Sequence, residues 1–389
     1  MTERARCFVG LMSGTSADGI DAVAVSFHGA HGPEDTRGGG SFSFRIEAHV
    51  HEGFDEGLRR RVLALPESDL EALALIHVEL GQHFGEAAKK AMEVAGWSSS
   101  QVMAVASPGL TAIHLPPSEN ERGATLSIGD GDVIAEVSGC RVLSDFRARD
   151  RAAGGHGAPL VPYADGVLLR EEGKVRAALN LGGIANITVV PPKGPLVAFD
   201  VGPGNMVLDG ALHRKSNGAM AYDENGEMAC AGRVDQPWLD RLLAEDEFLS
   251  QPPPRSTGRE RYGDTFYERF DTLVESLSIE DLAATLSAYT VAAIGMAVQD
   301  HVNHQIDEMV VSGGGALNLT LMGELETALA PLEVMDSERA LGIPVLAKEA
   351  LAFALIADAS LAGIPASLPF VTGARRPSLL GKISPASPR

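Results

Sequence analysis

The first polar segment of the chain combines small, hydroxyl and acidic residues in a single turn. Residues 10–23 read GLMSGTSADGIDAV, with apolar runs on both sides of the turn. Because glycine has no β-carbon, such a turn lets backbone N–H groups approach an anion, and its serines and threonine add hydroxyl donors. Asp18 and Asp21 would repel a bare phosphate, but they suit a divalent cation that bridges carboxylate and phosphate. The segment therefore predicts a turn that binds a metal-chelated polyphosphate, the alternative being an ordinary tight β-hairpin.

Glycine turns recur at the ends of two later strand-like runs. One contains Gly202 and Gly204, and the other contains Gly313, Gly314 and Gly315. Neither has the spacing of a Walker A loop or of a GxGxxG dinucleotide motif, so these two kinds of site are disfavoured. Together with the first turn they predict a nucleotide site, in which two turns hold the phosphates and the third lies against the adenosine.

The elements that must position these turns form two similar halves. Residues 7–12 and 20–27 are typical of two strands joined by the first turn, and residues 42–51 are expected to pair with them. Residues 175–190 repeat the strand, turn and strand, and a third strand over 196–199 runs into the sequence DVGPGN. Few residues are identical between the halves, so the repeat is architectural. It predicts a duplicated α/β fold with a cleft between two lobes.

Apolar periodicity predicts the long helices, and proline and glycine mark the loops. Residues 68–95 predict a helix with one apolar face, formed by Leu70, Leu73, Ile76, Leu80 and Phe84. Residues 282–299 predict a buried helix, because their polar side chains argue against a membrane span. The segment SPGLTAIHLPP, residues 107–117, is expected to be a loop.

Composition narrows the classes of function. The chain has 389 residues and a formal net charge of −20, so we expect two domains and no nucleic-acid partner. Three widely spaced cysteines predict no disulfide framework, which is typical of a reducing cytoplasm. Neither a signal peptide nor a membrane segment is expected.

Eight segments, spread in order along nearly the whole chain, carry a family resemblance: GLMSGTSADGIDAV, SIGDGDVIAEVSG, DFRARDRAAGGHGAPLVP, NLGGIANITVV, FDVGPGNMVLDG, PPPRSTGRE, VSGGGALN and EALAFALIA. Together they resemble the anhydro-N-acetylmuramic acid kinases of the actin, hexokinase and heat-shock-chaperone ATPase superfamily. The resemblance implies a duplicated ribonuclease H-like fold, with lobes over residues 1–144 plus 368–389 and over 145–367, and an ATP cleft between them. It also implies Mg²⁺, small-molecule substrates, a cytoplasmic location and a homodimer.

The activity implied by the resemblance is a kinase reaction coupled to hydrolysis. Such enzymes use ATP to open 1,6-anhydro-N-acetylmuramic acid with water, giving N-acetylmuramic acid 6-phosphate and ADP in cell-wall recycling. Glycoside cleavage ordinarily needs an acid and a base, but here the γ-phosphoryl group captures O6 as it leaves C1. One carboxylate can then suffice as the base that activates water. The resemblance assigns this role to Asp200, for which the residues alone equally allow a capping or turn aspartate.

The resemblance also implies roles for other residues. Glu349 is expected to be a second active-site carboxylate at a helix start, and Asp18 to lie near Mg²⁺. The residues assigned to ATP binding are Gly14, Thr15, Ser16, Ala17, Asp18, Gly19, Ile20 and Asp21 in the first turn, and Gly182, Gly183, Asn186, Gly202, Gly204, Asn205, Gly313, Gly314, Gly315 and Asn318 in the later turns.

The segments expected to face the sugar depart from the family pattern. Pro108 and Leu110 stand where the family has His and Gln, whereas Thr111 and His114 remain as candidate substrate residues. His156 replaces a Gln. These differences leave open a levoglucosan kinase-like enzyme or a plain sugar 6-kinase.

Two arginines are candidates for the acidic group of the sugar. Arg147 and Arg149 lie two residues apart, and we expect them to share one side of a strand or loop. Arginine suits a carboxylate such as the lactyl group of a muramic acid. The alternative is a surface ion pair with Asp145 or Asp150.

Overall fold

The chain folds into two compact units in a computed structural model that describes residues 5–14, 17–31, 42–65, 68–115 and 123–386. Unit 1 comprises Met1–Leu168 and Ala347–Arg389, and unit 2 comprises Leu169–Leu346. These boundaries differ from the predicted ones, because residues 145–168 and 347–367 pack with the N-terminal part of the chain. For example, helix α15 (Lys348–Leu361) lies against strands β1 (Arg6–Met12) and β2 (Gly19–His28).

Unit 1 is built on a six-stranded sheet with the order β13-β7-β4-β1-β2-β3. Strand β2 runs antiparallel to β1 and β3, whereas β4 and β7 run parallel to β1. The remaining strands of the unit are β3 (Ser43–Gly53), β4 (Val102–Ser107), β5 (Leu110–Leu115), β6 (Ala124–Ile128), β7 (Val142–Ser144) and β13 (Lys382–Ser384). Its helices are α1 (Glu56–Leu63), α2 (Leu70–Val94), α3 (Gly131–Ser138), α4 (Arg147–Ala152), α5 (Pro162–Leu169, which ends at the unit boundary), α15 and α16 (Pro369–Thr372).

Unit 2 is built on a five-stranded sheet with the order β10-β9-β8-β11-β12. Its strands are β8 (Arg176–Leu181), β9 (Ile184–Val190), β10 (Val197–Pro203), β11 (Glu308–Ser312) and β12 (Glu333–Asp336). Its helices are α6 (Asn205–Lys215), α7 (Glu227–Ala231), α8 (Gln236–Glu245), α9 (Arg259–Tyr262), α10 (Asp264–Arg269), α11 (Leu273–Ser276), α12 (Ile279–His301), α13 (Leu319–Ala328) and α14 (Ser337–Leu341).

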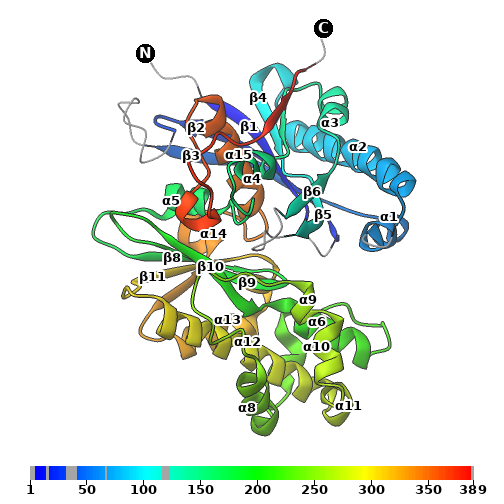
Figure 1. The fold of residues 1–389 in the computed structure, drawn as a ribbon, viewed down its shortest axis with the longest axis vertical. Coiled ribbons are helices and arrows are strands. Elements are labelled where there is room, and N and C mark those ends of the chain that lie inside the picture. Colours follow the sequence, from blue (N-terminus) through cyan, green and yellow to red (C-terminus); the bar gives the residue numbers. More distant parts are fainter. Residues whose placement is uncertain (1–4, 15–16, 32–41, 66–67, 116–122, 387–389) are drawn as a thin grey trace. The chain divides into compact units, whose positions relative to one another are not determined.

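The two sheets share one topology, which confirms the predicted duplication. In unit 2 the second strand, β9, is antiparallel to both neighbours, and β11 and β12 run parallel to β8. Strands β1, β2, β3, β4 and β7 of unit 1 have the same order and directions. The predicted α/β class and the predicted duplication of its two halves are therefore confirmed (Figure 1).

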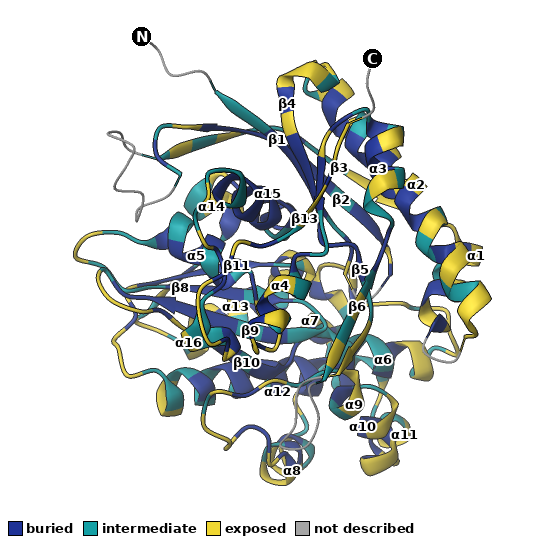
Figure 2. Cartoon of the chain, turned by 45° about the horizontal axis from the view of Figure 1, so that its top comes forward, coloured by how far each residue is buried: buried dark blue, intermediate teal, exposed yellow. Residues whose placement is uncertain are grey.

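The apolar cores follow from the sequence pattern with a few corrections. Figure 2 shows the strands of both sheets largely buried, and α12 packs on β10, α6 and α8 as the predicted buried helix. Of the described helices, α12 alone is long and apolar enough to cross a membrane, but most of it is buried inside unit 2. Leu70, by contrast, is 83% exposed, because it is the first residue of α2, one turn before the helix reaches the core.

Residues 107–117 were expected to form a loop, but they contain strand β5. It forms a two-stranded antiparallel sheet with β6, in which Thr111 lies opposite Ser127. The alternation of Leu110, Ala112 and His114 with their neighbours is interrupted by a register shift between Thr111 and Ile113, which obscures the strand pattern. This small sheet carries two of the candidate substrate residues.

Candidate functional site

A row of polar side chains crosses four strands of the unit 2 sheet. Ser312 on β11 lies opposite Asn180 on β8, Asn180 opposite Asn186 on β9, and Asn186 opposite Asp200 on β10. Residues directly opposite each other on paired strands project from the same face. The sheet therefore presents two amides, a hydroxyl and a carboxylate side by side on one face.

Two residues of this row each have a buried polar atom that makes no hydrogen bond to a described residue. The Oδ1 atom of Asn180 and the Oγ atom of Ser312 have no hydrogen-bond partner within the described ranges. Buried polar atoms are nearly always hydrogen-bonded, so such an orphan in a native fold points to a ligand, an ion or water. Asn180 and Ser312 lie beside the parallel strand ends, where open α/β sheets bind their ligands.

The predicted glycine turns of unit 2 come together next to this row. The N–H groups of Gly204 and Asn205 donate to the carbonyls of Gly183 and Gly182, at 3.0 and 2.8 Å. A β-carbon on Gly204 would lie 2.3 Å from the Gly182 carbonyl oxygen, so only glycine fits there.

The third glycine turn, Gly313 to Gly315, packs against the end of strand β8. Gly313 has φ +87°, and a β-carbon on it would lie 2.7 Å from Asn180 Oδ1 and 2.8 Å from the Leu181 carbonyl oxygen. A β-carbon on Gly315 would likewise lie too close to Leu181 and Asn205. A β-carbon on Gly314 would have more open space. The later glycines predicted to bind ATP thus form one cluster within unit 2.

Asp200 is held by the loop that follows Pro254. Its Oδ2 atom accepts hydrogen bonds from the Ser256 hydroxyl and the Thr257 N–H, both at 3.0 Å. Burial raises the pKa of this carboxyl above its ordinary value and Glu260 adds to the rise, while the two hydrogen bonds and the Arg255 charge oppose it. A raised pKa makes the ionised carboxylate a stronger base, which suits a group that removes a proton from water.

Asn318 has a structural role instead of facing the glycine cluster with its side chain. Its carboxamide oxygen accepts from the Leu321 N–H at 2.9 Å and so caps helix α13. The side-chain oxygen of Asn318 is thus engaged within unit 2, and its predicted role in ATP binding stays a prediction. Asn205, at the start of α6, directs its amide toward the Leu181 carbonyl at 3.5 Å and stays within the glycine cluster.

The first glycine turn belongs to unit 1, and Thr15 and Ser16 lie outside the described residues. Ala17 is buried with φ +53°, and its N–H donates to the Gly14 carbonyl at 3.1 Å. A left-handed alanine costs about 1–2 kcal/mol, so the turn is held in a strained form of the kind common at ligand sites. The buried hydroxyl of Ser13 has no partner among the described residues, which again points to a bound group.

The two aspartates of this turn differ in their surroundings. Asp18 is exposed and lies 3.5 Å from the Arg59 guanidinium. Asp21 is engaged, because His49 Nε2 and His51 Nδ1 lie 2.9 and 3.2 Å from its Oδ1 atom. Gly19 and Ile20 between them are buried, and a β-carbon on Gly19 would lie 2.4 Å from a carbonyl oxygen of β3. Of the two carboxylates, only Asp18 is presented for a cation.

The donor set of the first turn fits Mg²⁺ bound mainly through a phosphate ligand. No group of three or more His, Cys, Asp or Glu side chains in the described part of the chain could hold a metal by itself. Mg²⁺ usually keeps several waters and takes only one or two protein carboxylates beside substrate phosphates. A single exposed carboxylate at Asp18, in the same segment as the unsatisfied hydroxyl of Ser13, agrees with that mode.

Glu349 lies in the first turn of α15, as predicted, within a group of buried charges. Burial raises the pKa of its carboxyl, and Asp165 and Asp21 add to the rise, while Lys348 and Arg147 oppose it. The Lys348 ammonium is already paired with Asp165, at 2.6 Å. Arg147 donates to the Gly157 carbonyl at 2.9 Å, but its buried Nε has no partner in the described residues. A carboxylate and an arginine are therefore both available to a polar ligand in unit 1.

Four basic side chains gather near the small β5–β6 sheet. Burial lowers the pKa of His114, and the positive charges of Arg147, Arg151 and His156 lower it further. His114 Nδ1 lies 2.7 Å from the Thr125 hydroxyl, and Arg151 donates to the His156 carbonyl at 3.2 Å. We call His114, Arg147, Arg151 and His156 the basic cluster. Such a cluster attracts an anionic substituent.

The predicted pairing of Arg147 with Arg149 is wrong. Residues 147–152 form helix α4, where side chains two positions apart point to different sides and those four apart share a face. Arg151 therefore accompanies Arg147, and Arg149 is exposed to solvent. Thr111, the remaining candidate for substrate binding, is half-buried on β5.

Several residues of these sites were given no role on the basis of the sequence. They are Asn180, Arg255, Ser256, Thr257, Arg151 and Ser312. Ser312 directly precedes Gly313, and Asn180 lies two residues before Gly182, so their positions at or near the ends of apolar strands were the available signal. For Ser256 and Thr257 the signal was weaker, because a hydrogen bond across 56 positions leaves no local pattern.

Two duplicated sheets with glycine turns and orphaned polar atoms at the strand ends define a nucleotide-binding α/β protein. The family model for anhydro-N-acetylmuramic acid kinase matches residues 6–386. The chain belongs to this family, and the predicted class of enzyme, an ATP-using kinase of a sugar, is confirmed. The levoglucosan kinase-like alternative and the plain sugar kinase are not favoured.

Curated relatives align end to end with the chain. An anhydro-N-acetylmuramic acid kinase of Gloeobacter violaceus is 40% identical over 97% of this chain and 98% of its own length. Those of Streptomyces coelicolor and Caldanaerobacter subterraneus are 39% and 37% identical, each over 97% of this chain and over 93% and 97% of their own lengths.

Proposed function

We propose that this chain converts 1,6-anhydro-N-acetylmuramic acid, ATP and water into N-acetylmuramic acid 6-phosphate and ADP, in the recycling of cell-wall sugars. The observation that carries the proposal is the environment of Asp200. One of its oxygens is fixed by two donors, while the other accepts no hydrogen bond from a described residue, on a sheet face lined by unsatisfied polar atoms. That is the arrangement expected of a base that receives a proton at a defined atom.

The bond changes balance with a single base. The Asp200 carboxylate removes a proton from water as the water oxygen bonds to C1 of the sugar. The C1–O6 bond breaks, and O6 bonds to the γ-phosphorus of ATP as the bond from that phosphorus to the β-phosphate oxygen breaks. ADP leaves, and the proton on Asp200 passes to solvent. A positioned base contributes roughly 10²–10⁴-fold to the rate.

In this proposal the glycine cluster of unit 2 binds ATP, and the family resemblance alone gives the first turn of unit 1 a phosphate-binding role. Backbone N–H groups that no β-carbon shields can donate to phosphate oxygens. Asp18 would hold Mg²⁺, through water, together with the phosphates, and the bound ion would neutralise part of the polyphosphate charge. Glu349 would help to orient the attacking water or the sugar hydroxyls.

The basic cluster supports the choice of sugar. The lactyl ether of a muramic acid ends in a carboxylate, whereas levoglucosan carries no ionised group. The Arg147 and Arg151 guanidinium groups can bind a carboxylate through two parallel hydrogen bonds, and His114 is available as a neutral donor. From the family resemblance alone, we also propose a cytoplasmic homodimer that acts without a membrane or nucleic-acid partner.

The test is an ADP-release assay with the anhydro-muramic acid and levoglucosan side by side, in water enriched in ¹⁸O. We expect turnover of the first sugar with the heavy label at C1, and little turnover of the second. Asp200→Asn should retain ATP binding and lose most of this turnover. Label that stays out of the product, or near-normal turnover by the asparagine variant, would show that Asp200 is not the base for water.

A further inference from the structure

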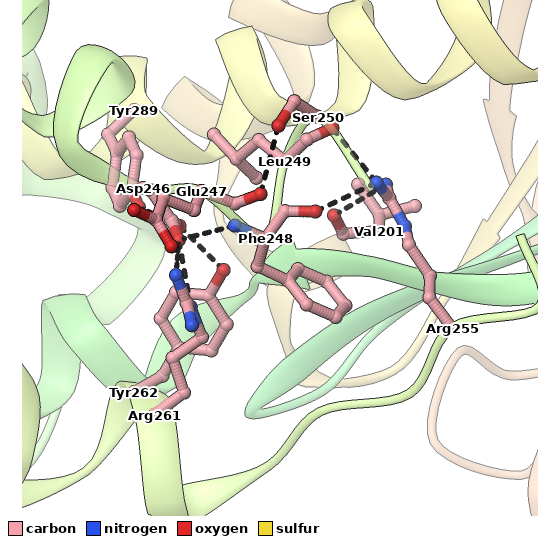
Figure 3. Close-up of polar contacts among 10 residues, drawn as sticks. All are labelled: Val201, Asp246, Glu247, Phe248, Leu249, Ser250, Arg255, Arg261, Tyr262 and Tyr289. Atoms are coloured by element: carbon pink, nitrogen blue, oxygen red, sulfur yellow. Dashed lines mark hydrogen bonds and ion pairs between the residues drawn. The ribbon is translucent and has the colours of Figure 1, made fainter. Parts of the chain in front are cut away.

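The side chain of Arg255 is buried in a cage of backbone carbonyls. Its Nε donates to the carbonyl of Asp200 at 2.8 Å, and one terminal nitrogen donates to Val201 at 3.0 Å. The other terminal nitrogen donates to the carbonyls of Phe248, Leu249 and Gln251, at 2.8–3.1 Å. Figure 3 shows the guanidinium between β10 and the segment after α8. This one side chain therefore ties three segments of unit 2 together.

The segment that carries the Phe248 and Leu249 carbonyls is anchored by a buried aspartate, because the N–H groups of Phe248 and Leu249 donate to Asp246 Oδ1 and to the Asp246 carbonyl, at 3.3 and 3.1 Å. Asp246 accepts from Tyr262 and Tyr289 at 2.7 and 2.6 Å, and from the Arg261 Nε at 2.8 Å (Figure 3). Asp246 as a whole is 2% exposed. Because Tyr262 and Arg261 belong to α9, this anchor fixes the far end of the loop that begins after Gln251.

The loop between these two anchors carries the donors to Asp200. Ser256 and Thr257 follow Arg255 directly, and both donate to the same carboxylate oxygen, Oδ2. The backbone is paired as well, since the Asp200 N–H donates to the Arg255 carbonyl at 3.3 Å. The loop thus selects one orientation of the carboxyl group, in which Oδ1 accepts no hydrogen bond from a described residue.

We propose that Arg255 is a positioning residue for the catalytic base, and that its carbonyl cage sets the direction in which Asp200 presents Oδ1 to water. This inference rests on the proposed function, which makes Asp200 the base. Arg255 does not need to touch sugar or ATP for this role. It acts through the loop, by holding Ser256 and Thr257 against Oδ2.

Lysine cannot replace arginine in this cage. A guanidinium presents five N–H donors in a planar fork, and here all three of its nitrogens donate, in different directions. An ammonium is a single point with three donors, so it can reach only part of the carbonyl set. Arg255→Lys therefore keeps the charge but releases the loop.

The experiment measures kcat against pH for Arg255→Lys and Ser256→Ala. Hydrogen bonds to the ionised carboxylate favour that form, so losing them raises the pKa of Asp200. We expect the acid-side fall of kcat to move up by about one pH unit in both variants. Arg255→Lys should also lose roughly 10–100-fold in kcat because the base is misplaced, while the KM for ATP stays within about twofold.

The charged groups that face Asp200 are Arg255 and Glu260, and His301 Nε2 lies 3.3 Å from the Arg255 guanidinium. Ser256 has no hydrogen bond to His301, so a shift common to both variants belongs to Asp200. Arg176→Lys is the matched control. Arg176 is a partly buried arginine on β8 of the same unit, with a side chain that is 15% exposed, and it pairs with Glu308 on β11. Strand β8 is two strands away from β10 in the sheet. We expect it to change thermal stability and to leave the pH profile in place.

The outcomes separate this inference from the proposed function. If Asp200→Asn abolishes turnover while both loop variants keep the wild-type acid limb, the base assignment stands and the positioning role is overturned. If Asp200→Asn remains active, Asp200 is not the base, and the positioning role of Arg255 falls with that assignment. Because Ser256 is exposed, Ser256→Ala folds even where Arg255→Lys does not, so the pH profile of at least one variant is measurable.

Discussion

Asp246 offers the sharpest test of the energetics of unit 2. Asp246→Asn removes a buried charge while keeping the size of the side chain, and it places an amide beside the Arg261 guanidinium. Removing one partner of a buried ion pair lowers the free energy of unfolding by roughly 3–5 kcal/mol. Because an asparagine oxygen can still accept hydrogen bonds from Tyr262 and Tyr289, we use the lower value of this range, about 3 kcal/mol. For a unit of this size, 1 kcal/mol shifts Tm by about 2–4 °C. We therefore expect Tm to fall by roughly 6–12 °C.

The same residue gives a dependence on pH whose sign is fixed by its hydrogen bonds. Burial alone would raise the pKa of Asp246, but Tyr289, Tyr262 and Arg261 together bring it below the ordinary value. A carboxyl group whose pKa is lowered by folding stabilises the protein above the pKa of the unfolded chain, about 3.9, and this contribution is lost as pH falls through the folded pKa. The difference in Tm between wild type and Asp246→Asn should thus be steady from about pH 5 to pH 8 and shrink below about pH 4.

The assay is thermal unfolding followed by circular dichroism, with Asp264→Asn as the control. Asp264 also pairs with an arginine, Arg214, but its side chain is 88% exposed, and such pairs contribute about 0–1 kcal/mol. The control should stay within about 3 °C of wild type. If Asp246→Asn matches the control at neutral pH, or if its deficit grows at low pH, the reasoning about the buried carboxylate is refuted.

Three further results are expected. Gly204→Ala should lower ATP affinity at least about tenfold in equilibrium titration, because the added β-carbon would overlap a backbone carbonyl. The control is Gly323→Ala, where the β-carbon would enter open space within α13. This variant should be more stable by about 0.5–1 kcal/mol and should bind ATP normally. Arg151→Ala should raise the KM for the lactyl-bearing sugar roughly 10–100-fold. Arg149→Ala, at an exposed position, should leave this KM unchanged. Equal changes in KM for the two variants would show that the basic cluster does not bind the substrate. Chelation of divalent metal should abolish turnover and added Mg²⁺ restore it, with Asp18→Asn requiring more Mg²⁺ for half the maximal rate; a rate indifferent to chelation contradicts the metal assignment.

The fold was largely predictable because its signals are local. Strands such as β1, β2, β8 and β9 are short apolar runs bounded by glycine turns, and the second half repeats the order of the first. Helix α2 is preceded by its N-cap residue Asp69, whose side chain accepts from the Ala72 N–H at 2.9 Å, and its apolar spacing is regular. The catalytic candidates Asp200 and Glu349 came from motif resemblance, and their burial is a property that only the packed structure supplies.

The rest depends on contacts between residues that are distant in sequence. The pairing of Arg147 with Arg151 required knowing that residues 147–152 form a helix, and a six-residue segment rich in arginine carries little periodicity. The unit boundaries moved because α15 packs on β1, where Gly10 has no β-carbon to prevent the approach of the Ala350 carbonyl. No sequence pattern announces such a contact across more than 300 positions.

The carbonyl cage has a consequence for solubility as well as for chemistry. Strand β10 is the outermost strand of its sheet, and an uncovered outer strand offers its backbone to strands of other molecules. The loop that orients Asp200 occupies this outer side, and its run of prolines, residues 252–254, cannot extend the ladder with N–H donors of its own. A single segment thus both aims the base and shields the sheet from intermolecular pairing, and variants that detach it should be recovered increasingly as aggregates.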